Sequence, residues 1–279
     1  MLQFERDGIR LYFGVAGNPD APPILFLHGF RGEHRLWYPV MWGLGDTYRS
    51  IAPDLRGRGR SSAPEGVDAY GMNVYVEDLG ALMDHLEIEL AAIVGCSFGG
   101  MIALQFAVNC PERVAALCIT DALPAAVSDR YSSEFGEREE RLAELEEVVR
   151  QGATLALVRR GHVPAVSDPA LAAEIARRTA AMSTDGYLGI AYTRRTRPDL
   201  IPLLRERLTM PVLLCTGDQD PVRSGFRAMR DELPDARAVT FADLGHGVPF
   251  ADPDRFLKEL SRFLGDVEEG RATAGDRTA

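Results

Sequence analysis

The residues best suited to chemistry lie in the segment GCSFGG at residues 95–100, where a serine stands between glycines in the pattern G-x-S-x-G. An apolar run at 91–95 precedes this segment, and a run with helical periodicity at 98–108 follows it. A sharp turn from strand to helix projects a serine hydroxyl at a helix N-terminus, where free N–H groups favour developing negative charge. The pattern therefore predicts that Ser97 is the nucleophile of an acyl-transfer reaction.

A serine nucleophile needs a neighbouring base, and that base needs a carboxylate that fixes its tautomer. Among the five histidines, His246 comes last in the chain, follows an apolar run and is flanked by two glycines. The other four histidines are His28, His34, His85 and His162. We predict that His246 is the base. Four aspartates near the ends of predicted strands are candidates for the acid, and these are Asp121, Asp218, Asp220 and Asp243.

Cys96 is a second potential nucleophile because it directly precedes Ser97. Neighbouring side chains in a sharp turn point in different directions, so His246 cannot serve both residues, and we expect Cys96 to be unreactive. The chain has no C-x-x-C pair, which predicts reduced thiols of a cytoplasmic protein. The four thiols belong to Cys96, Cys110, Cys118 and Cys215.

Eight short apolar runs bounded by turn residues predict the strands that position these side chains. They span residues 2–5, 9–16, 24–27, 50–53, 91–95, 114–120, 212–216 and 238–241. Helical periodicity between them, at about 72–87, 98–108 and 252–264, predicts a mostly parallel sheet wrapped by helices. Residues 123–204 contain no convincing strand but include an acidic helical pattern at 132–152 and a helix start at Asp168-Pro169. This stretch predicts a helical cap.

The composition of the chain limits which kinds of partner we expect for the protein. With 279 residues and a formal net charge of −10, the chain has no long-range attraction for nucleic acid or an anionic membrane. No apolar run approaches the roughly 20 residues that span a bilayer, and the first residues do not resemble a signal peptide. We expect a cytoplasmic protein with no membrane or nucleic-acid partner, either a monomer or a homodimer. The chain carries none of the usual metal, P-loop or dinucleotide motifs, so we predict no metal and no organic cofactor.

Six motifs in order resemble the α/β-hydrolase superfamily, serine-hydrolase branch, over nearly the whole predicted core. They are LFLHGF at 25–30, DLRGRGRS at 54–61, GCSFGG at 95–100, PERV at 111–114, GDQDPV at 217–222 and GHGVPFADPDRF at 245–256. The resemblance implies an α/β-hydrolase fold, with a mostly parallel eight-stranded sheet flanked by helices and an inserted helical cap. It also implies a core at 1–122 and 206–265, a cap at 123–205 and, after them, a disordered tail at 266–279.

The same resemblance implies roles for individual residues. The pattern G-x-x-D after a late strand selects Asp220 as the acid, with Asp121 as the alternative because some members take their acid from the earlier strand. The family's two backbone oxyanion donors correspond to the N–H groups of Phe30 and Phe98. The predicted substrate pocket is lined by His28, Gly29, Trp37 and Phe250.

The predicted function is cleavage of an ester-type bond, in a carboxylic ester or lactone of a small, partly apolar substrate. The segments 54–61 and 95–107 look most like carboxylesterases and 3-oxoadipate enol-lactonases. The segment HGFRGEHRLW also resembles the menaquinone-pathway synthases, which are lyases, although Met101 stands where that group tends to have arginine. The alternative is therefore a lyase, a C–C bond-acting enzyme or a ligand-binding receptor of the same fold.

Overall fold

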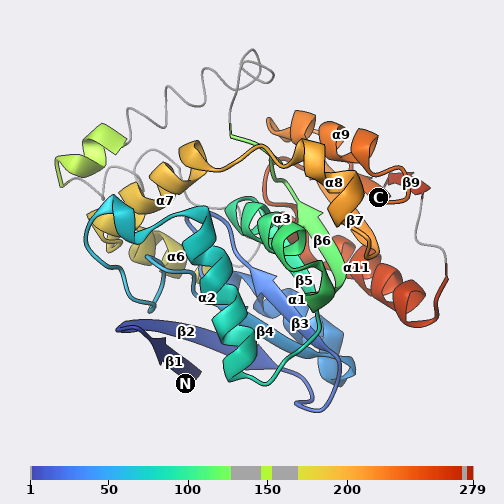
Figure 1. The fold of residues 1–279 in the computed structure, drawn as a ribbon, viewed down its shortest axis with the longest axis horizontal. Helices are drawn as coiled ribbons and strands as arrows, with labels where there is room; N and C mark the ends of the chain where they lie inside the picture. Colours follow the sequence, from blue (N-terminus) through green and yellow to red (C-terminus); the bar gives the residue numbers. More distant parts are fainter. Residues whose placement is uncertain (1, 127–145, 153–168, 272–274, 279) are drawn as a thin grey trace.

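A computed structural model describes residues 2–126, 146–152, 169–271 and 275–278. It contains one sheet of nine strands in the order β1-β2-β4-β3-β5-β6-β7-β8-β9 (Figure 1). Strand β2 pairs antiparallel with β1 and β4, and all the other pairs are parallel. The strands are β1 (Leu2–Arg6), β2 (Ile9–Ala16), β3 (Pro23–Leu27), β4 (Arg49–Pro53), β5 (Ala91–Cys96), β6 (Val114–Thr120), β7 (Val212–Gly217), β8 (Arg237–Phe241) and β9 (Gly275–Thr278).

Helices cover both faces of the sheet, which confirms the predicted α/β architecture. One buried cluster includes side chains of α2, α3, α8 and α9, and a second includes side chains of α1, α10 and α11. The helices are α1 (Tyr38–Leu44), α2 (Met72–His85), α3 (Phe98–Asn109), α6 (Pro169–Ala180), α7 (Thr184–Thr196), α8 (Ile201–Arg207), α9 (Arg223–Glu232), α10 (Val248–Ala251) and α11 (Pro253–Glu268).

The central strands are buried on both sides, and this explains why they appear in the sequence as unbroken apolar runs. In β3, Leu25 and Leu27 belong to the first cluster, whereas Ile24 and Phe26 belong to the second. Alternate side chains of a strand point to opposite faces of a sheet, so every residue of such a strand meets apolar neighbours. All eight predicted strands are present, with ends that differ by no more than a residue or two.

The structure corrects the expectation that the chain is disordered after residue 265. Helix α11 continues to Glu268, and β9 pairs in parallel with β8 at the edge of the sheet. The pairing joins Arg237 to Gly275 and Thr240 to Thr278. The segment Gly275–Thr278 has no apolar pattern, because the unpaired backbone groups of an edge strand can recruit a polar segment through main-chain bonds alone.

Helices α6 and α7 lie together at one side of the molecule (Figure 1) and belong to the predicted cap. Helix α6 begins at Pro169, as its sequence predicts. Most of the acidic helix predicted at 132–152, and Asp168, lie outside the described residues. The division into core and cap stays a prediction. Among the helices that the structure describes, none is both long and apolar enough to cross a membrane.

Candidate functional site

The turn between β5 and α3 holds Ser97 in a strained conformation. Its φ is 55° and its ψ is −114°, although it is not a glycine. Such backbone strain in a residue other than glycine concentrates at functional sites. The glycine at position 99 makes the turn possible, because a Cβ there would lie 2.1 Å from the carbonyl oxygen of Leu27.

The structure brings the three predicted catalytic residues into one chain of hydrogen bonds. The Oγ of Ser97 lies 2.9 Å from Nε2 of His246, and Nδ1 of His246 lies 3.0 and 3.1 Å from the two carboxylate oxygens of Asp220. With Nδ1 protonated, the ring donates to Asp220 and accepts from the serine hydroxyl. Ser97 follows β5, Asp220 follows β7 and His246 follows β8, so three strand ends supply the group.

The acid predicted from the family pattern, Asp220, is a buried carboxylate held by several donors. Its Oδ1 also accepts from the N–H of Val222 at 2.9 Å. Burial by itself raises the pKa of Asp220, but the charge and hydrogen bond of His246 and the other donors outweigh burial, so the net pKa is lowered. Asp220 is therefore ionised at neutral pH.

The alternative acid, Asp121, lies behind Asp220 and holds the histidine loop. Its Oδ2 accepts from the N–H groups of Gly247 at 3.2 Å and Val248 at 2.9 Å, and also from the hydroxyl of Thr120. Burial, followed by the negative charge of Asp220, raises the pKa of Asp121 well above its ordinary value. Asp121 binds the loop after His246 and makes no hydrogen bond to the histidine ring, so its contacts are those of a positioning group.

The two predicted oxyanion donors flank Ser97. Phe98 is the first residue of α3, where backbone N–H groups have no partner within the helix. Phe30 follows Gly29, at which an added Cβ would lie 3.3 Å from the Cβ and 3.8 Å from the Oγ of Ser97. The chain after β3 thus passes close to the serine, and the roles of Gly29, Phe30 and Phe98 stay predictions.

His28 joins two loops in the interior and is not exposed to solvent. Its Nδ1–H donates to the carbonyl of Gly29 at 2.8 Å, while its Nε2 accepts from the N–H of Leu55 at 3.1 Å. Burial lowers the pKa of His28 to about 4, so the ring is neutral at pH 7. Its observed contacts position the loop that carries Gly29 and Phe30, and they do not line a pocket.

Trp37 and Phe250, which the sequence predicts in the substrate pocket, are buried in a core cluster, and their role in a pocket stays a prediction. Trp37 is fully buried and packs edge-on against Phe250, with ring centroids 4.9 Å apart, and also against Phe26. All three belong to the cluster that includes α1 and α11. An aromatic side chain near a functional motif can pack on either side of the sheet. Here both rings pack on the side that α1 covers.

Cys96 is buried, and burial raises the pKa of its thiol well above the ordinary value. A thiol reacts as the thiolate, so this environment suppresses nucleophilic attack. Cys96 points toward Asp121, with Sγ 3.9 Å from Oδ2, and the expectation that it cannot share His246 agrees with this direction. None of the four cysteines forms a disulfide.

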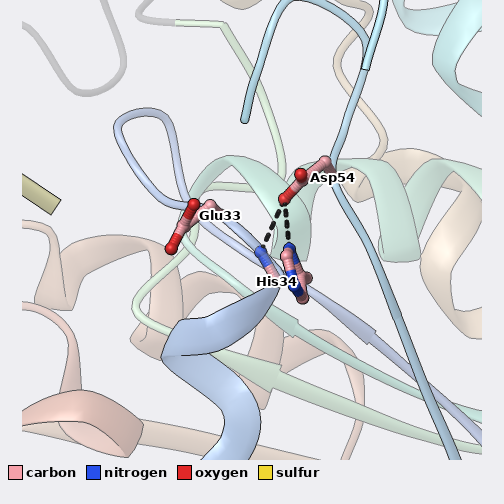
Figure 2. A group of neighbouring side chains, drawn as sticks. All are labelled: Glu33, His34 and Asp54. Atoms are coloured by element: carbon pink, nitrogen blue, oxygen red, sulfur yellow. Dashed lines mark hydrogen bonds and ion pairs between the residues drawn. The ribbon is translucent and has the colours of Figure 1, made fainter. Parts of the chain in front are cut away.

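Asp54 and His34 form a buried pair that the sequence did not assign. Oδ1 of Asp54 accepts from both the backbone N–H and Nδ1–H of His34 at 2.8 Å (Figure 2). Oδ2 of Asp54 accepts from the N–H of Arg60 at 2.8 Å. A carboxylate oxygen of Glu33 lies within 4.8 Å of the pair but makes no hydrogen bond to it, and Glu33 accepts from Arg35 instead. These oxygen and nitrogen atoms satisfy one another, so the grouping fastens the loop after β4 to the loop after β3. In the sequence, only the position of Asp54 at the start of the motif DLRGRGRS pointed to this pair.

Comparisons with known proteins support the same architecture. The chain is 28% identical over 272 residues to the putative 2-succinyl-6-hydroxy-2,4-cyclohexadiene-1-carboxylate synthase of Bacillus subtilis, covering 94% of this chain and 97% of that one. It is 27% identical over 219 residues to 3-oxoadipate enol-lactonase 2 of Acinetobacter baylyi, covering 77% of each.

A solved structure matches nearly the whole chain. It is a thermophilic esterase from Thermogutta terrifontis with malate bound, at 28% identity and a TM-score of 0.79, and the match covers 95% of this chain and 97% of the esterase. The sequence profile of the alpha/beta hydrolase fold family matches residues 22–253. Because that match spans most of the chain, the protein belongs to the alpha/beta hydrolase family.

Proposed function

We propose that the protein is a serine hydrolase that cleaves a carboxylic ester or lactone of a small, partly apolar substrate. The observation that carries this proposal is the continuous hydrogen-bond chain from Ser97 through His246 to the ionised Asp220. A serine that donates to a histidine, itself oriented by a carboxylate, is arranged for nucleophilic attack on a carbonyl.

In the proposed reaction, His246 Nε2 takes the proton of Ser97 Oγ as that oxygen attacks the carbonyl carbon. The tetrahedral intermediate carries negative charge on the former carbonyl oxygen, and the N–H groups of Phe30 and Phe98 donate to it. Collapse expels the alcohol or enol, which receives the proton from His246. Water, deprotonated by the same histidine, then releases the acid from Ser97.

The relatives favour an acyl C–O bond as the target. One is named a lactonase and another an esterase, and both names describe the opening of such a bond. The similarity to a putative synthase over 94% of the chain favours one second candidate, a lyase that uses the same serine and histidine without hydrolysis. Turnover of an ester by the wild type separates the two.

A direct test is to expose the protein to a fluorophosphonate probe and measure intact mass and turnover of p-nitrophenyl acetate. The wild type should gain one probe adduct and hydrolyse the ester, and Ser97→Ala should do neither. Ser224→Ala on α9 is a matched control, because its hydroxyl has no hydrogen-bond partner among the described residues. An unlabelled, inactive wild type with an intact fold would contradict the proposal.

A further inference from the structure

A cavity of about 250 Å³ lies between loops of the predicted core and residues of the predicted cap, and the proposed catalytic residues are not part of its wall. Three segments of the chain form it: the loop after β3, the loop after β4 and the chain at the end of α6. Its lining includes two guanidinium groups, those of Arg31 and Arg58, and the N-cap serine of α7, Ser183. The cavity is thus polar and positively charged.

Arg58 is the unusual member of this lining. It is only 4% exposed, and none of its three guanidinium nitrogens has a hydrogen-bond partner among the described residues. The glycines on either side of it, Gly57 and Gly59, have φ values of +77° and +53°. Such φ values favour glycine. The two glycines therefore allow the loop conformation in which the side chain of Arg58 is buried.

The other arginines of the motif DLRGRGRS have ordinary structural roles. Arg56 donates from Nε and Nη2 to the two carboxylate oxygens of Asp78, at 2.8 and 2.7 Å. Arg60 is exposed and lies over the ring of Tyr12. Arg56 and Arg60 therefore have contacts typical of structural arginines.

Among the described residues, no carboxylate forms an ion pair or hydrogen bond with the buried guanidinium of Arg58. Burial lowers the pKa of Arg58 to about 10, so the group is still a cation at pH 7. The nearest carboxylate of the lining, Glu33, accepts instead from Arg35. A buried cation without a partner strongly disfavours the folded state, and an anion that enters the cavity would remove that cost.

The ring of Phe30 connects this cation to the proposed reaction centre. The guanidinium carbon of Arg58 lies 5.2 Å from the centroid of the Phe30 ring, and those of Arg31 and Arg194 lie 5.7 Å from it. Phe30 is also the residue whose N–H is the proposed oxyanion donor, and a Cβ added to Gly29 before it would lie 3.3 Å from the Cβ of Ser97. Phe30 therefore connects the arginine group to the loop that passes close to Ser97.

We propose that Arg58 binds a carboxylate at the far end of the substrate, so that the protein prefers monoanionic esters or lactones over neutral ones. The planar guanidinium matches a carboxylate with two parallel N–H donors. This inference rests on the proposed function, since it assigns one end of the molecule whose acyl carbon meets Ser97.

The first test compares mono-p-nitrophenyl glutarate, which has a free carboxylate, with its methyl ester, which has the same length and no charge. The wild type should show a kcat/KM about 10-fold to 100-fold higher for the anion, the size of one charge-assisted hydrogen bond. Arg58→Gln should remove this preference and leave kcat/KM for the methyl ester within about threefold. Arg60→Gln, an exposed arginine of the same loop, is the matched control and should keep the preference.

The second test measures binding without chemistry. Glutarate should raise the thermal midpoint of Ser97→Ala and should have no effect on the double variant Ser97→Ala, Arg58→Gln. Without ligand, Arg58→Gln should be at least as stable as the wild type, because it removes a buried unpaired cation; a purely structural arginine would give the opposite result. Arg58→Lys keeps the positive charge but lacks the two parallel N–H donors of the guanidinium, so it should retain only part of the glutarate binding.

The outcomes separate the two proposals. If the wild type hydrolyses neither ester but glutarate binds through Arg58, the hydrolase proposal fails and the anion site stands. If the wild type hydrolyses both esters equally and Arg58→Gln changes neither rate, the anion site is refuted and the hydrolase remains. Glutarate binding that does not depend on Arg58 also refutes the site.

Discussion

The two buried carboxyl groups near His246 have opposite pKa shifts, which predicts different protonation states that amide substitutions can test. The pKa of Asp220 is lowered and this residue accepts from Nδ1–H of His246, whereas the pKa of Asp121 is raised and this residue accepts from the backbone after His246. Asp220→Asn replaces an acceptor of the ring proton with an amide that fits the wrong tautomer. Asp121→Asn exchanges a neutral acid for a neutral amide of the same shape, with one oxygen and one donor.

The expected effects on turnover differ by orders of magnitude. Loss of the orienting carboxylate in a Ser-His-Asp system lowers kcat by about 10⁴-fold, so Asp220→Asn should lose about 10³-fold to 10⁴-fold. Asp121→Asn should stay within about threefold of the wild type. Asp121→Ala leaves the buried N–H groups of Gly247 and Val248 without an acceptor, at about 1–3 kcal/mol each. We therefore expect it to lose about 2–6 kcal/mol of stability.

The assay measures kcat with p-nitrophenyl acetate and stability by urea unfolding for all three variants. Full activity of Asp220→Asn together with inactive Asp121→Asn would refute the assignment and make Asp121 the acid. Equal losses in both amide variants would refute the different protonation states.

The pH dependence of stability gives an independent measure of the neutral carboxyl group. The pKa of Asp121 is raised in the folded protein, so the folded state holds a proton that the unfolded chain releases above about pH 4. Its stabilising contribution is complete below that pH and is lost as pH rises toward the folded pKa. Asp121→Asn has no such proton, so its stability relative to the wild type should increase from pH 5 to pH 8. A constant or decreasing difference would show that Asp121 is ionised.

Two further predictions concern the loops around Ser97. His28 has a pKa lowered to about 4, so stability present above about pH 6.5 should fall by up to about 3 kcal/mol as pH drops toward 4, and His28→Gln should remove this slope in urea unfolding. Gly99→Ala places a Cβ 2.1 Å from the Leu27 carbonyl and should cost about 3 kcal/mol or more. In Gly29→Ala the added Cβ would lie 3.3 Å from the Cβ of Ser97, so this variant should have a lower kcat and a thermal midpoint within a few degrees of the wild type. If Gly29→Ala were less stable than Gly99→Ala, both close approaches would be contradicted.

The central strands of this fold could be predicted because parallel strands buried on both faces must be apolar along their whole length. The same reasoning misses β9, since the segment Gly275–Thr278 joins the sheet through its backbone and has no apolar pattern. Helix ends such as Glu268 were also missed, because polar residues continue a helix when only one face packs.

For the candidate site, spacing identified the serine, the histidine and the acid, because each follows a strand whose direction the sequence reveals. Spacing could not tell whether a side chain beside a motif enters a pocket or the core, and Trp37 is buried in a core cluster. It also could not distinguish Arg56, which pairs with Asp78 of a helix distant in the sequence, from Arg58, which has no hydrogen-bond partner in the part of the chain that the structure describes. Long-range packing decides both questions.

The register of the parallel strands explains how these groups converge. Gly95 pairs with Leu27 on one side, and Cys96 with Thr120 on the other, so the chain after each strand leaves the sheet at the same edge. Ser97 and Asp121 then bond back to the neighbouring strands through Thr120 and Cys215, and both have φ near +55°. Backbone hydrogen bonds to the neighbouring strands thus hold both residues in place, independently of their side-chain contacts.

Charge is distributed across this edge in a way that suits an anionic substrate. Near His246, the raised pKa of Asp121 favours its neutral form beside the ionised Asp220, which limits the negative charge there. Arg58, in the loop after β4, supplies a buried positive charge beside the ring of Phe30. A second ionised carboxylate would oppose both the oxyanion and an anionic substrate. The raised pKa of Asp121 limits negative charge near the histidine, and Arg58, which has no hydrogen-bond partner among the described residues, leaves a cation for the ligand, so both features bear on the same reaction.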